Sequence, residues 1–240
     1  MKNPVDINTE LRIVVCGYRD WAKEIICKIE QIDRVVITRK FLSYDEYQIG
    51  ISSIEKDTAF ILFLGWSWII PVEITSRFLC LGIHPSDLPY YRGGSPIQHQ
   101  IINGLTKSKV TLMTLSSEKL DGGDIWGKED LDLNGDNMEV IFRNIVDSSV
   151  ILLTNFIARF PNCVALMQSP NEGSYFKRRK SEDSRITHKD FKEKPLIEIY
   201  NKIRSLTDPY PNAYMEDELG NKLFFKEVTF IENEKKLTQS

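Results

Sequence analysis

Apolar residues along the chain occur in short runs separated by stretches with helical spacing. Four runs have the length and the β-branched or aromatic content of buried strands. They are Leu11 to Val15, Val35 to Thr38, Ala59 to Leu64 and Arg77 to Ile83. Between the first two runs, Trp21 to Ile29 carries apolar residues every three or four positions, as an amphipathic helix does. The alternation predicts an α/β protein with a Rossmann-like, mostly parallel sheet and helices on both faces.

The same pattern continues to about residue 165 and then changes. It predicts two more helices and one more strand: Pro96 to Asn103, Met138 to Phe160 and Val110 to Leu115. Phe176 to Lys194 holds eight Lys or Arg and four Asp or Glu, which predicts an exposed connecting loop. A helix at Pro195 to Leu206 and a hairpin turning at Glu218 to Asn221 follow. We expect a core over residues 1–165 and a small hairpin-containing subdomain over 166–240.

Composition and charge limit the classes of protein. With 42% apolar and 27% charged residues, the chain can bury a core, which excludes general disorder. The near-apolar run from Ala59 to Val72 is shorter than the roughly 20 residues of a membrane helix. The first ten residues contain no apolar signal core. With neither a membrane helix nor a signal core, we expect a cytoplasmic protein without a membrane partner. Because the net charge is −3, we expect no nucleic-acid partner either.

The cysteines and histidines do not form a metal-binding or disulfide pattern. No CxxC pair occurs, and the histidines lack the spacing of metal ligands. The residues concerned are Cys16, Cys27, Cys80, Cys163, His84, His99 and His188. We therefore expect no metal cofactor.

A histidine at a predicted strand end is the strongest candidate for chemistry. His84 ends the fourth run, and Pro85 restricts it to an extended backbone. Carboxyl ends of parallel strands are where ligands gather, so we favour a functional role over the structural one that most lone histidines have. The following Arg92-Gly93-Gly94 would let a ligand approach the backbone, although the same residues suit an ordinary turn.

A second candidate lies beyond the strand predicted at Val110 to Leu115. Asp121 and Asp124 flank two glycines there, which by itself indicates a solvated turn. If the fold brings Asp121 to His84, its carboxylate would orient the imidazole for proton transfer. The spacing alone does not show that the two meet.

These blocks resemble the formyltransferase family that uses formyltetrahydrofolate. The central blocks are HPSDLPYYRGGSPIQ from His84, VTLM from Val110 and LDGGDI from Leu120. Outer blocks are FLGWSWIIP from Phe63, YFKRR from Tyr175 and DPYPNA from Asp208. The resemblance covers roughly residues 11 to 228. It implies formyltetrahydrofolate as co-substrate and formyl transfer to an amine.

The resemblance also implies roles for individual residues. The catalytic pair becomes His84 and Asp121. The folate-binding residues become Phe63, Leu64, Gly65, Trp66, Ile83 and Asp124. The acceptor-binding residues become Tyr91, Arg92, Gly93, Gly94, Tyr175, Lys177 and Arg178. For Trp66 and Trp68, simple packing is an equal alternative.

At one position the chain departs from the family pattern. The family has an asparagine two residues before the histidine, where this chain has Gly82. In the family that amide holds the formyl oxygen and stabilises the tetrahedral oxyanion, which glycine has no side chain to do. If the donor is simply missing, Gly82→Asn should raise turnover. If another donor or a water fills the space, the added side chain should clash and lower activity. If glycine is kept for its backbone angles, asparagine should destabilise the fold.

The downstream blocks look like those of sugar N-formyltransferases. The transfer-RNA branch of the family carries a basic C-terminal domain, and this chain ends before one. We therefore expect a nucleotide-linked amino deoxysugar as acceptor, in bacterial surface polysaccharide (O-antigen) biosynthesis. The run from Lys177 to Lys180 then meets a diphosphate or is merely solvated. Alternatives are a catalytically degenerate folate or nucleotide-sugar binding protein, a folate hydrolase and a methionyl-tRNA formyltransferase-like enzyme. The resemblance implies a homodimer through the hairpin.

Overall fold

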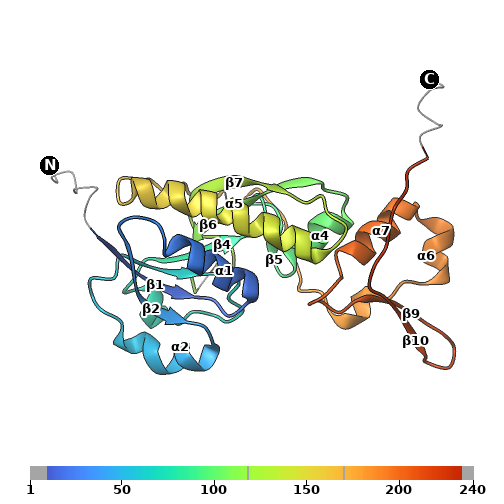
Figure 1. Cartoon of the computed structure of the whole chain (residues 1–240), viewed down its shortest axis with the longest axis horizontal. Helices are drawn as coiled ribbons and strands as arrows, with labels where there is room; N and C mark the ends of the chain where they lie inside the picture. Colours follow the sequence, from blue (N-terminus) through green and yellow to red (C-terminus); the bar gives the residue numbers. More distant parts are fainter. Residues whose placement is uncertain (1–9, 118, 170, 234–240) are drawn as a thin grey trace, which may run out of the picture.

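A six-stranded sheet forms the centre of the computed structural model, which describes residues 10–117, 119–169 and 171–233 (Figure 1). The strand order is β2-β1-β3-β4-β6-β7, with the first four strands parallel and β6 and β7 antiparallel to their neighbours. The strands are β1 (Leu11–Cys16), β2 (Val35–Phe41), β3 (Phe60–Phe63), β4 (Cys80–His84), β6 (Lys107–Thr114) and β7 (Ile125–Asp132). The predicted mostly parallel α/β sheet is confirmed.

Helices cover both faces of the sheet, as the alternation of side chains along β1 requires. Ile13 and Val15 pack in one cluster with α1 (Asp20–Ile29), α5 (Met138–Arg159) and α4 (Pro96–Ile102). Val14 and Cys16 point the other way, into a cluster with α2 (Tyr44–Gly50), the turn η1 (Ile51–Ser53) and the short α3 (Val72–Thr75). Both faces of β1, β3 and β4 are therefore buried, and β3 is apolar at every position for that reason.

The long helix α5 anchors the first cluster. It begins after Asn137, whose side chain accepts a hydrogen bond from the Val140 N–H, and runs beside α1 in Figure 1. By length and composition it is the one described helix that would also fit a membrane span, and half of its most apolar stretch is buried inside the protein. Its buried residues pack on the sheet, so α5 serves the core of the fold.

A third hydrophobic cluster lies in the C-terminal part of the chain, at the orange and red end of Figure 1. It contains Ile186, residues of α7 (Leu196–Arg204), and the hairpin of β9 (Ala213–Glu216) and β10 (Lys222–Phe225). The predicted helix and hairpin are confirmed. The buried Arg204 joins this unit to the sheet by donating to the carbonyls of Leu133 and Gly135 at 2.8 and 2.9 Å.

The expected loop at 176–194 is wrong in part. It contains the turn η2 (Ser181–Ser184) and the helix α6 (His188–Glu193). Thr187 and Asp190 form a reciprocal capping box at the start of α6, a signal that the charged composition of the segment obscured. At the start of the segment, the two-residue strand β8 (Tyr175–Phe176) pairs in parallel with the two-residue strand β5 (Arg92–Gly93).

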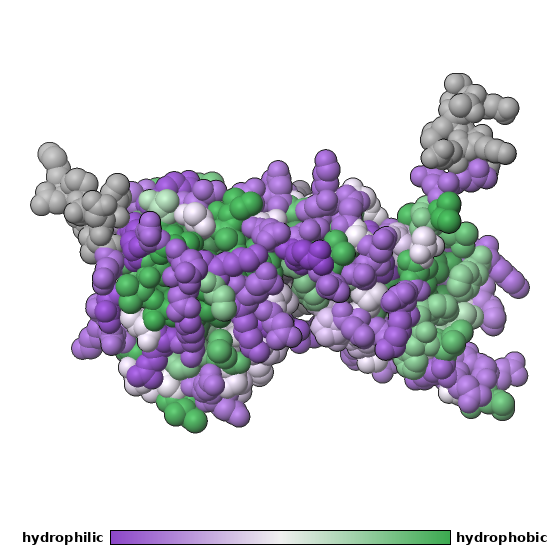
Figure 2. All heavy atoms as spheres, viewed as in Figure 1, coloured by the Kyte–Doolittle hydropathy of each residue, from purple (hydrophilic) through white to green (hydrophobic). Residues whose placement is uncertain are grey.

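Three expectations are not decided by the fold. The domain boundary near residue 165 and the homodimer remain predictions. On the face seen in Figure 2, apolar residues are gathered over the C-terminal unit. Leu196 and Leu223 are among the exposed apolar residues of that unit. The first nine residues, where a signal core was not expected, lie outside the described part of the chain.

The packing of α5 makes a testable statement about stability. Phe156 is fully buried against the rings of Phe60, Trp126 and Phe160. We expect Phe156→Ala to lower the free energy of unfolding in urea by about 3 to 5 kcal/mol because it leaves a cavity. Ile151→Ala on the same helix, at a side chain 51% exposed, should cost about 0.5 kcal/mol or less. Equal losses in the two variants would contradict this packing.

Candidate active site

His84 lies at the carboxyl end of β4 and is 6% exposed. Its Nε2 atom is 2.9 Å from the carbonyl oxygen of Tyr91. A carbonyl only accepts, so Nε2 carries the hydrogen of the neutral ring. The other ring nitrogen, Nδ1, faces the Oδ1 atom of Asp121 at 3.6 Å. That separation is too long for a hydrogen bond and short enough for an ion pair when the ring is protonated. Nδ1 is therefore the nitrogen available for proton transfer.

Asp121 is held in place by its second oxygen. Oδ2 accepts a hydrogen bond from the backbone N–H of Gly93 at 2.8 Å, which turns Oδ1 towards His84. The structure thus brings together the two residues expected to act as a pair. Their route to each other differs from the expectation, because β6 runs antiparallel to β4 and ends beside Leu81. The loop that follows β6 turns back to bring Asp121 to the ring.

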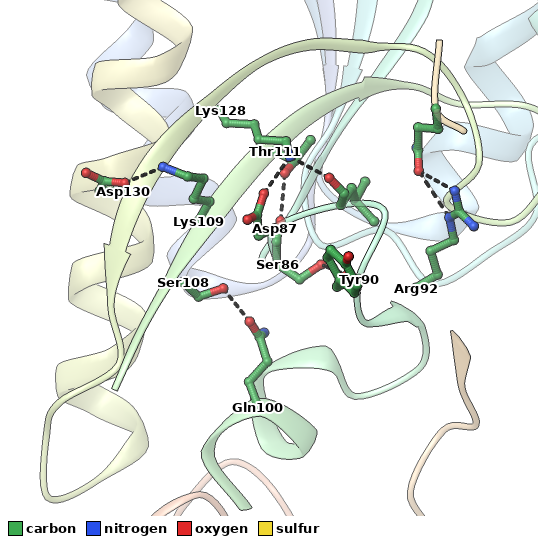
Figure 3. Close-up of polar contacts among 12 residues, drawn as sticks. Ser86, Asp87, Tyr90, Arg92, Gln100, Ser108, Lys109, Thr111, Lys128 and Asp130 are labelled. Carbon is green, nitrogen blue, oxygen red and sulfur yellow. Dashed lines mark hydrogen bonds and ion pairs between the residues drawn. The ribbon is translucent and has the colours of Figure 1, made fainter. Parts of the chain in front are cut away.

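The loop from Pro85 to Tyr91 is fixed by side chains of β6, β7 and α4. These contacts hold the Tyr91 carbonyl that orients His84, and several are drawn in Figure 3. From β6, Thr111 Oγ1 donates to the Ser86 carbonyl at 2.6 Å, and from β7, Lys128 Nζ donates to Asp87 Oδ1 and the Leu88 carbonyl at 2.5 Å each. From α4, Gln100 Nε2 donates to the Pro85 carbonyl at 2.8 Å. Within the loop, Ser86 Oγ donates to the Tyr90 carbonyl at 2.7 Å. Sequence reasoning missed Thr111, Lys128 and Gln100 because no local pattern marks them.

The seven residues expected to bind an acceptor lie together around the β5–β8 pair. Tyr91 stacks on Phe176 with ring centroids 4.9 Å apart, and Gly94 donates to the Phe176 carbonyl at 2.8 Å. Gly93 has a φ of +94°, and a Cβ there would lie 2.2 Å from the same carbonyl. The two glycines therefore permit strand pairing. The Arg92 side chain is taken up by protein acceptors, whereas Tyr175, Lys177 and Arg178 are exposed.

The residues expected to bind folate differ in the atoms that they can offer to a ligand. The side chains of Phe63, Leu64 and Ile83 are buried in the core, so only their backbone can meet a ligand. Gly65 has a φ of +58°, and its position against the Trp21 ring leaves no room for a Cβ. Asp124 is exposed, and its carbonyl accepts from the Thr114 N–H at 2.8 Å.

Trp66 belongs to an aromatic cluster beyond the end of β3. Its ring packs 5.0 Å from Tyr47 and 4.9 Å from Trp68, and Trp68 stacks on Tyr44 at 4.6 Å. The side chains of Trp66 and Trp68 are thus packed against other aromatic rings, as the packing alternative expects. The buried indole N–H of Trp66 nevertheless has no acceptor among the described residues, so an acceptor atom of a bound heterocycle would satisfy it.

Gly82 lies two residues before His84 on the same face of β4. A Cβ at this position would lie 2.8 to 3.0 Å from the side-chain carbons of Leu115. Leu115 follows β6, and its N–H donates to the carbonyl of Cys80 at 2.8 Å. The space that a longer residue at position 82 would need is therefore filled by leucine. The leucine side chain supplies no hydrogen-bond donor in place of the family asparagine, so it is neither the donor nor the water that the sequence left open. Because the space is filled, we expect an added side chain at position 82 to clash with Leu115.

The thiols near the site are not prepared for nucleophilic chemistry. Burial raises the pKa of Cys80 to about 12, and burial also raises the pKa of Cys16 well above its ordinary value. Both thiols stay protonated at neutral pH, so neither provides a thiolate. Among residues 10–117, 119–169 and 171–233, no group of three or more His, Cys, Asp or Glu side chains is placed to hold a metal ion.

Comparison with known proteins identifies the family of the chain. Residues 11–148 match the formyl transferase family, and the chain belongs to that family. A methionyl-tRNA formyltransferase of a Nitratiruptor species is 34% identical over 206 residues, which are 85% of this chain and 64% of the relative. Formyltetrahydrofolate is the formyl donor of the family, as expected.

Two solved structures share the fold. The methionyl-tRNA formyltransferase from Clostridium thermocellum superposes with a TM-score of 0.74 at 30% identity, covering 92% of this chain and 94% of that one. A 4-N formyltransferase from Francisella tularensis gives 0.72 at 23% identity, covering 92% and 99%. Relatives named for methionyl-tRNA contradict the expectation that nucleic acid is excluded. That expectation used the net charge, which averages over the surface and hides local basic patches.

The contact between Gly82 and Leu115 predicts the result of restoring the family residue. We expect Gly82→Asn to lower the free energy of unfolding by about 1 to 3 kcal/mol, because it overpacks a filled space. Leu115→Ala should cost stability by itself. Adding Leu115→Ala to Gly82→Asn should recover part of the loss, as urea unfolding of the four proteins will measure. A Gly82→Asn protein as stable as the parent would contradict this account.

Proposed function

We propose that this chain transfers a formyl group from formyltetrahydrofolate to a primary amine. The observation that carries the proposal is the His84–Asp121 pair, with Nε2 fixed by the Tyr91 carbonyl and Nδ1 facing a carboxylate. An attacking amine must lose a proton, and the leaving nitrogen must gain one. Nδ1 of His84 accepts the first proton and returns it, while Asp121 stabilises the intervening positive charge on the ring.

The donor fits the end of the sheet next to His84. β3 pairs with β4 so that Phe63 lies opposite Gly82, which places the segment after Phe63 beside His84. Trp66 would hold the folate heterocycle through its unpaired indole N–H, together with backbone groups of residues 63–66. When bound, formyltetrahydrofolate supplies the formyl carbon and the leaving nitrogen. The protonated His84 ring would stabilise the oxyanion, since Gly82 offers no side chain.

For the acceptor we propose the amino group of methionyl-tRNA. Support comes from the methionyl-tRNA formyltransferases that are 30 to 34% identical to this chain. The chain covers 64% of the length of the first of these relatives. Lys177, Arg178 and Lys180 are exposed beside β5, where they can contact nucleic-acid phosphates.

A nucleotide-linked amino deoxysugar is the second candidate. The observation in its favour is Tyr175, which is 60% exposed next to Lys177 and Arg178. An exposed ring can stack on a nucleotide base, and two adjacent cations can pair with a diphosphate. Such a surface is small compared with the one that a tRNA would cover. Surface polysaccharide biosynthesis would be the setting of that activity.

One assay separates these functions. The protein is incubated with formyltetrahydrofolate and either methionyl-tRNA or a panel of nucleotide amino sugars, and formylated product and formate are followed by mass spectrometry. Formyl-methionyl-tRNA is the expected product. If only a formylated sugar forms, the acceptor is the nucleotide amino sugar and not methionyl-tRNA. Formate release without an amine indicates a hydrolase, and ligand binding without any product indicates a degenerate binding protein. Either of these last two results would overturn the proposal.

The paired residues predict a large effect on turnover. His84→Ala and Asp121→Asn should each lower kcat by about 100- to 10,000-fold, the usual value of a positioned proton-transfer group. The affinity for the acceptor should change little. His188→Ala, at an exposed histidine that begins α6, serves as the control and should keep the parent kcat. Near-parental turnover in either site variant would remove the pair from the mechanism.

The exposed basic residues predict a different kinetic effect. Lys177→Ala combined with Arg178→Ala should raise KM for the acceptor while kcat and the KM for the folate stay near the parent values. The reason is that contacts to phosphate are equally strong in the ground state and the transition state. Lys189→Ala on α6 removes another exposed charge, outside the run from Lys177 to Lys180, and should have no effect. If the acceptor KM is unchanged, the basic run is a solvated loop.

A further inference from the structure

Gln168 lies in the segment after α5 and is 7% exposed. Its side-chain oxygen accepts hydrogen bonds from Arg92 Nε at 3.1 Å and Arg92 Nη2 at 2.7 Å, drawn as the two dashed lines at Arg92 in Figure 3. Its side-chain nitrogen donates to the carbonyl of Asp121 at 2.9 Å and to that of Gly123 at 2.7 Å. One amide therefore joins β5 to the loop that carries Asp121.

The four contacts use the whole bonding capacity of the amide. A primary amide has two N–H donors and one oxygen with two lone pairs. The guanidinium of Arg92 only donates and the two carbonyls only accept, so the amide has a single satisfactory orientation. Neither Glu nor Leu at position 168 could make the same set of bonds.

The loop needs such support because its own conformation is unfavourable. Asp121 has a φ of +52°, a left-handed conformation that residues with a Cβ rarely adopt and that persists only where the surroundings enforce it. Gly123 lies so close to the Thr114 carbonyl that a Cβ would approach its oxygen to 1.9 Å. The Gly122 N–H reaches the Lys119 carbonyl only at 3.3 Å, a weak bond within the turn.

The two ends of the amide also converge on the catalytic carboxylate. The residue after Arg92 is Gly93, whose N–H holds Asp121 Oδ2 at 2.8 Å. Gln168 thus fixes both the donor strand, through Arg92, and the acceptor loop, through the Asp121 carbonyl. A shift of either partner would turn Oδ1 away from His84.

We propose that Gln168 is a positioning residue for formyl transfer, which sets Asp121 against His84 by bridging Arg92 to the Asp121–Gly123 loop. Gln168 does not contact the imidazole ring and acts through Asp121. The inference rests on the proposed role of the His84–Asp121 pair.

Gln168→Glu separates the two ends of the bridge. The carboxylate keeps the acceptor for Arg92 and loses both donors to the loop, where its second oxygen then opposes two carbonyls. We expect kcat to fall about 10- to 100-fold with little change in either KM, because misplacing a catalytic group by an ångström costs about that much. Gln168→Asn, which is too short to span both partners, should act in the same direction and serves if the Glu variant does not fold.

A matched control is available in the C-terminal unit. The buried Asn201 also accepts from an arginine, with Arg204 Nε at 2.8 Å, far along the chain from Asp121. Asn201→Ala should lose stability and keep the parent kcat. If it lowers kcat as much as Gln168→Glu, the effect at 168 is a general loss of stability and the proposal is wrong.

Two readouts distinguish positioning from structure. In an Asp121→Asn background, Gln168→Glu should lower kcat by less than about twofold further, since groups acting as a unit are not additive. A further full loss would overturn the proposal. Independently of activity, hydrogen exchange at the Gly93 amide should be at least tenfold faster in Gln168→Glu and unchanged in Asn201→Ala. Unchanged exchange in both would overturn the proposal even if the protein proves to be a formyltransferase. Faster exchange in a protein that formylates nothing would support the bridge and reject the function.

Discussion

The antiparallel pairing of β6 with β4 is the contact on which the site depends. It lines up Thr111 with His84, and the hydroxyl of Thr111 then reaches the Ser86 carbonyl in the turn after His84. It also ends β6 beside Leu81, so that the following loop must turn back over the sheet to reach the imidazole. A parallel strand in this place would carry its loop off the same edge and would not place Leu115 over Gly82. The register of β6 on β4 therefore determines where His84 lies, how the chain reaches Asp121 and which side chain fills the space beside Gly82.

Backbone groups do most of the orientation within the pair. The Tyr91 carbonyl decides which imidazole nitrogen carries the hydrogen, and the Gly93 N–H decides which carboxylate oxygen faces the ring. Both groups come from the same short stretch of chain around β5. The chemistry of the pair thus depends on the position of this stretch, which orients the pair through its backbone and is itself held by the Arg92 side chain. That loop is in turn fixed by Lys128 and Gln100 from two other elements.

The sequence predicted the parts of the fold that local patterns specify. The runs that became β1 and β3 are apolar on both faces, and α5 has a capping asparagine and a helical period over 22 residues. His84 and Asp121 were found through glycine- and proline-rich loops next to strands. What escaped prediction depends on distant contacts. The strand β7 is polar at an edge of the sheet, and the amide of Gln168 acquires its partners only after folding. Phe63 and Leu64 were assigned to folate by the resemblance, and only the fold shows that their side chains are buried and leave the backbone to meet a ligand.

The pairing of β5 with β8 has a consequence for the order in which the site is built. His84 and Asp121 both lie within residues 11–148, the segment that defines the family. The strand that supports Gly93, together with Ser174, whose hydroxyl accepts from the Tyr91 N–H at 2.9 Å, is encoded after α5. A nascent chain that has released only the family segment from the ribosome therefore contains both reactive groups and the Tyr91 and Gly93 backbone that orients them, but lacks the strand and the hydroxyl that hold this backbone. The contacts of Gln168, Ser174 and β8 thus complete, from the C-terminal side of α5, a site whose reactive groups all lie on its N-terminal side.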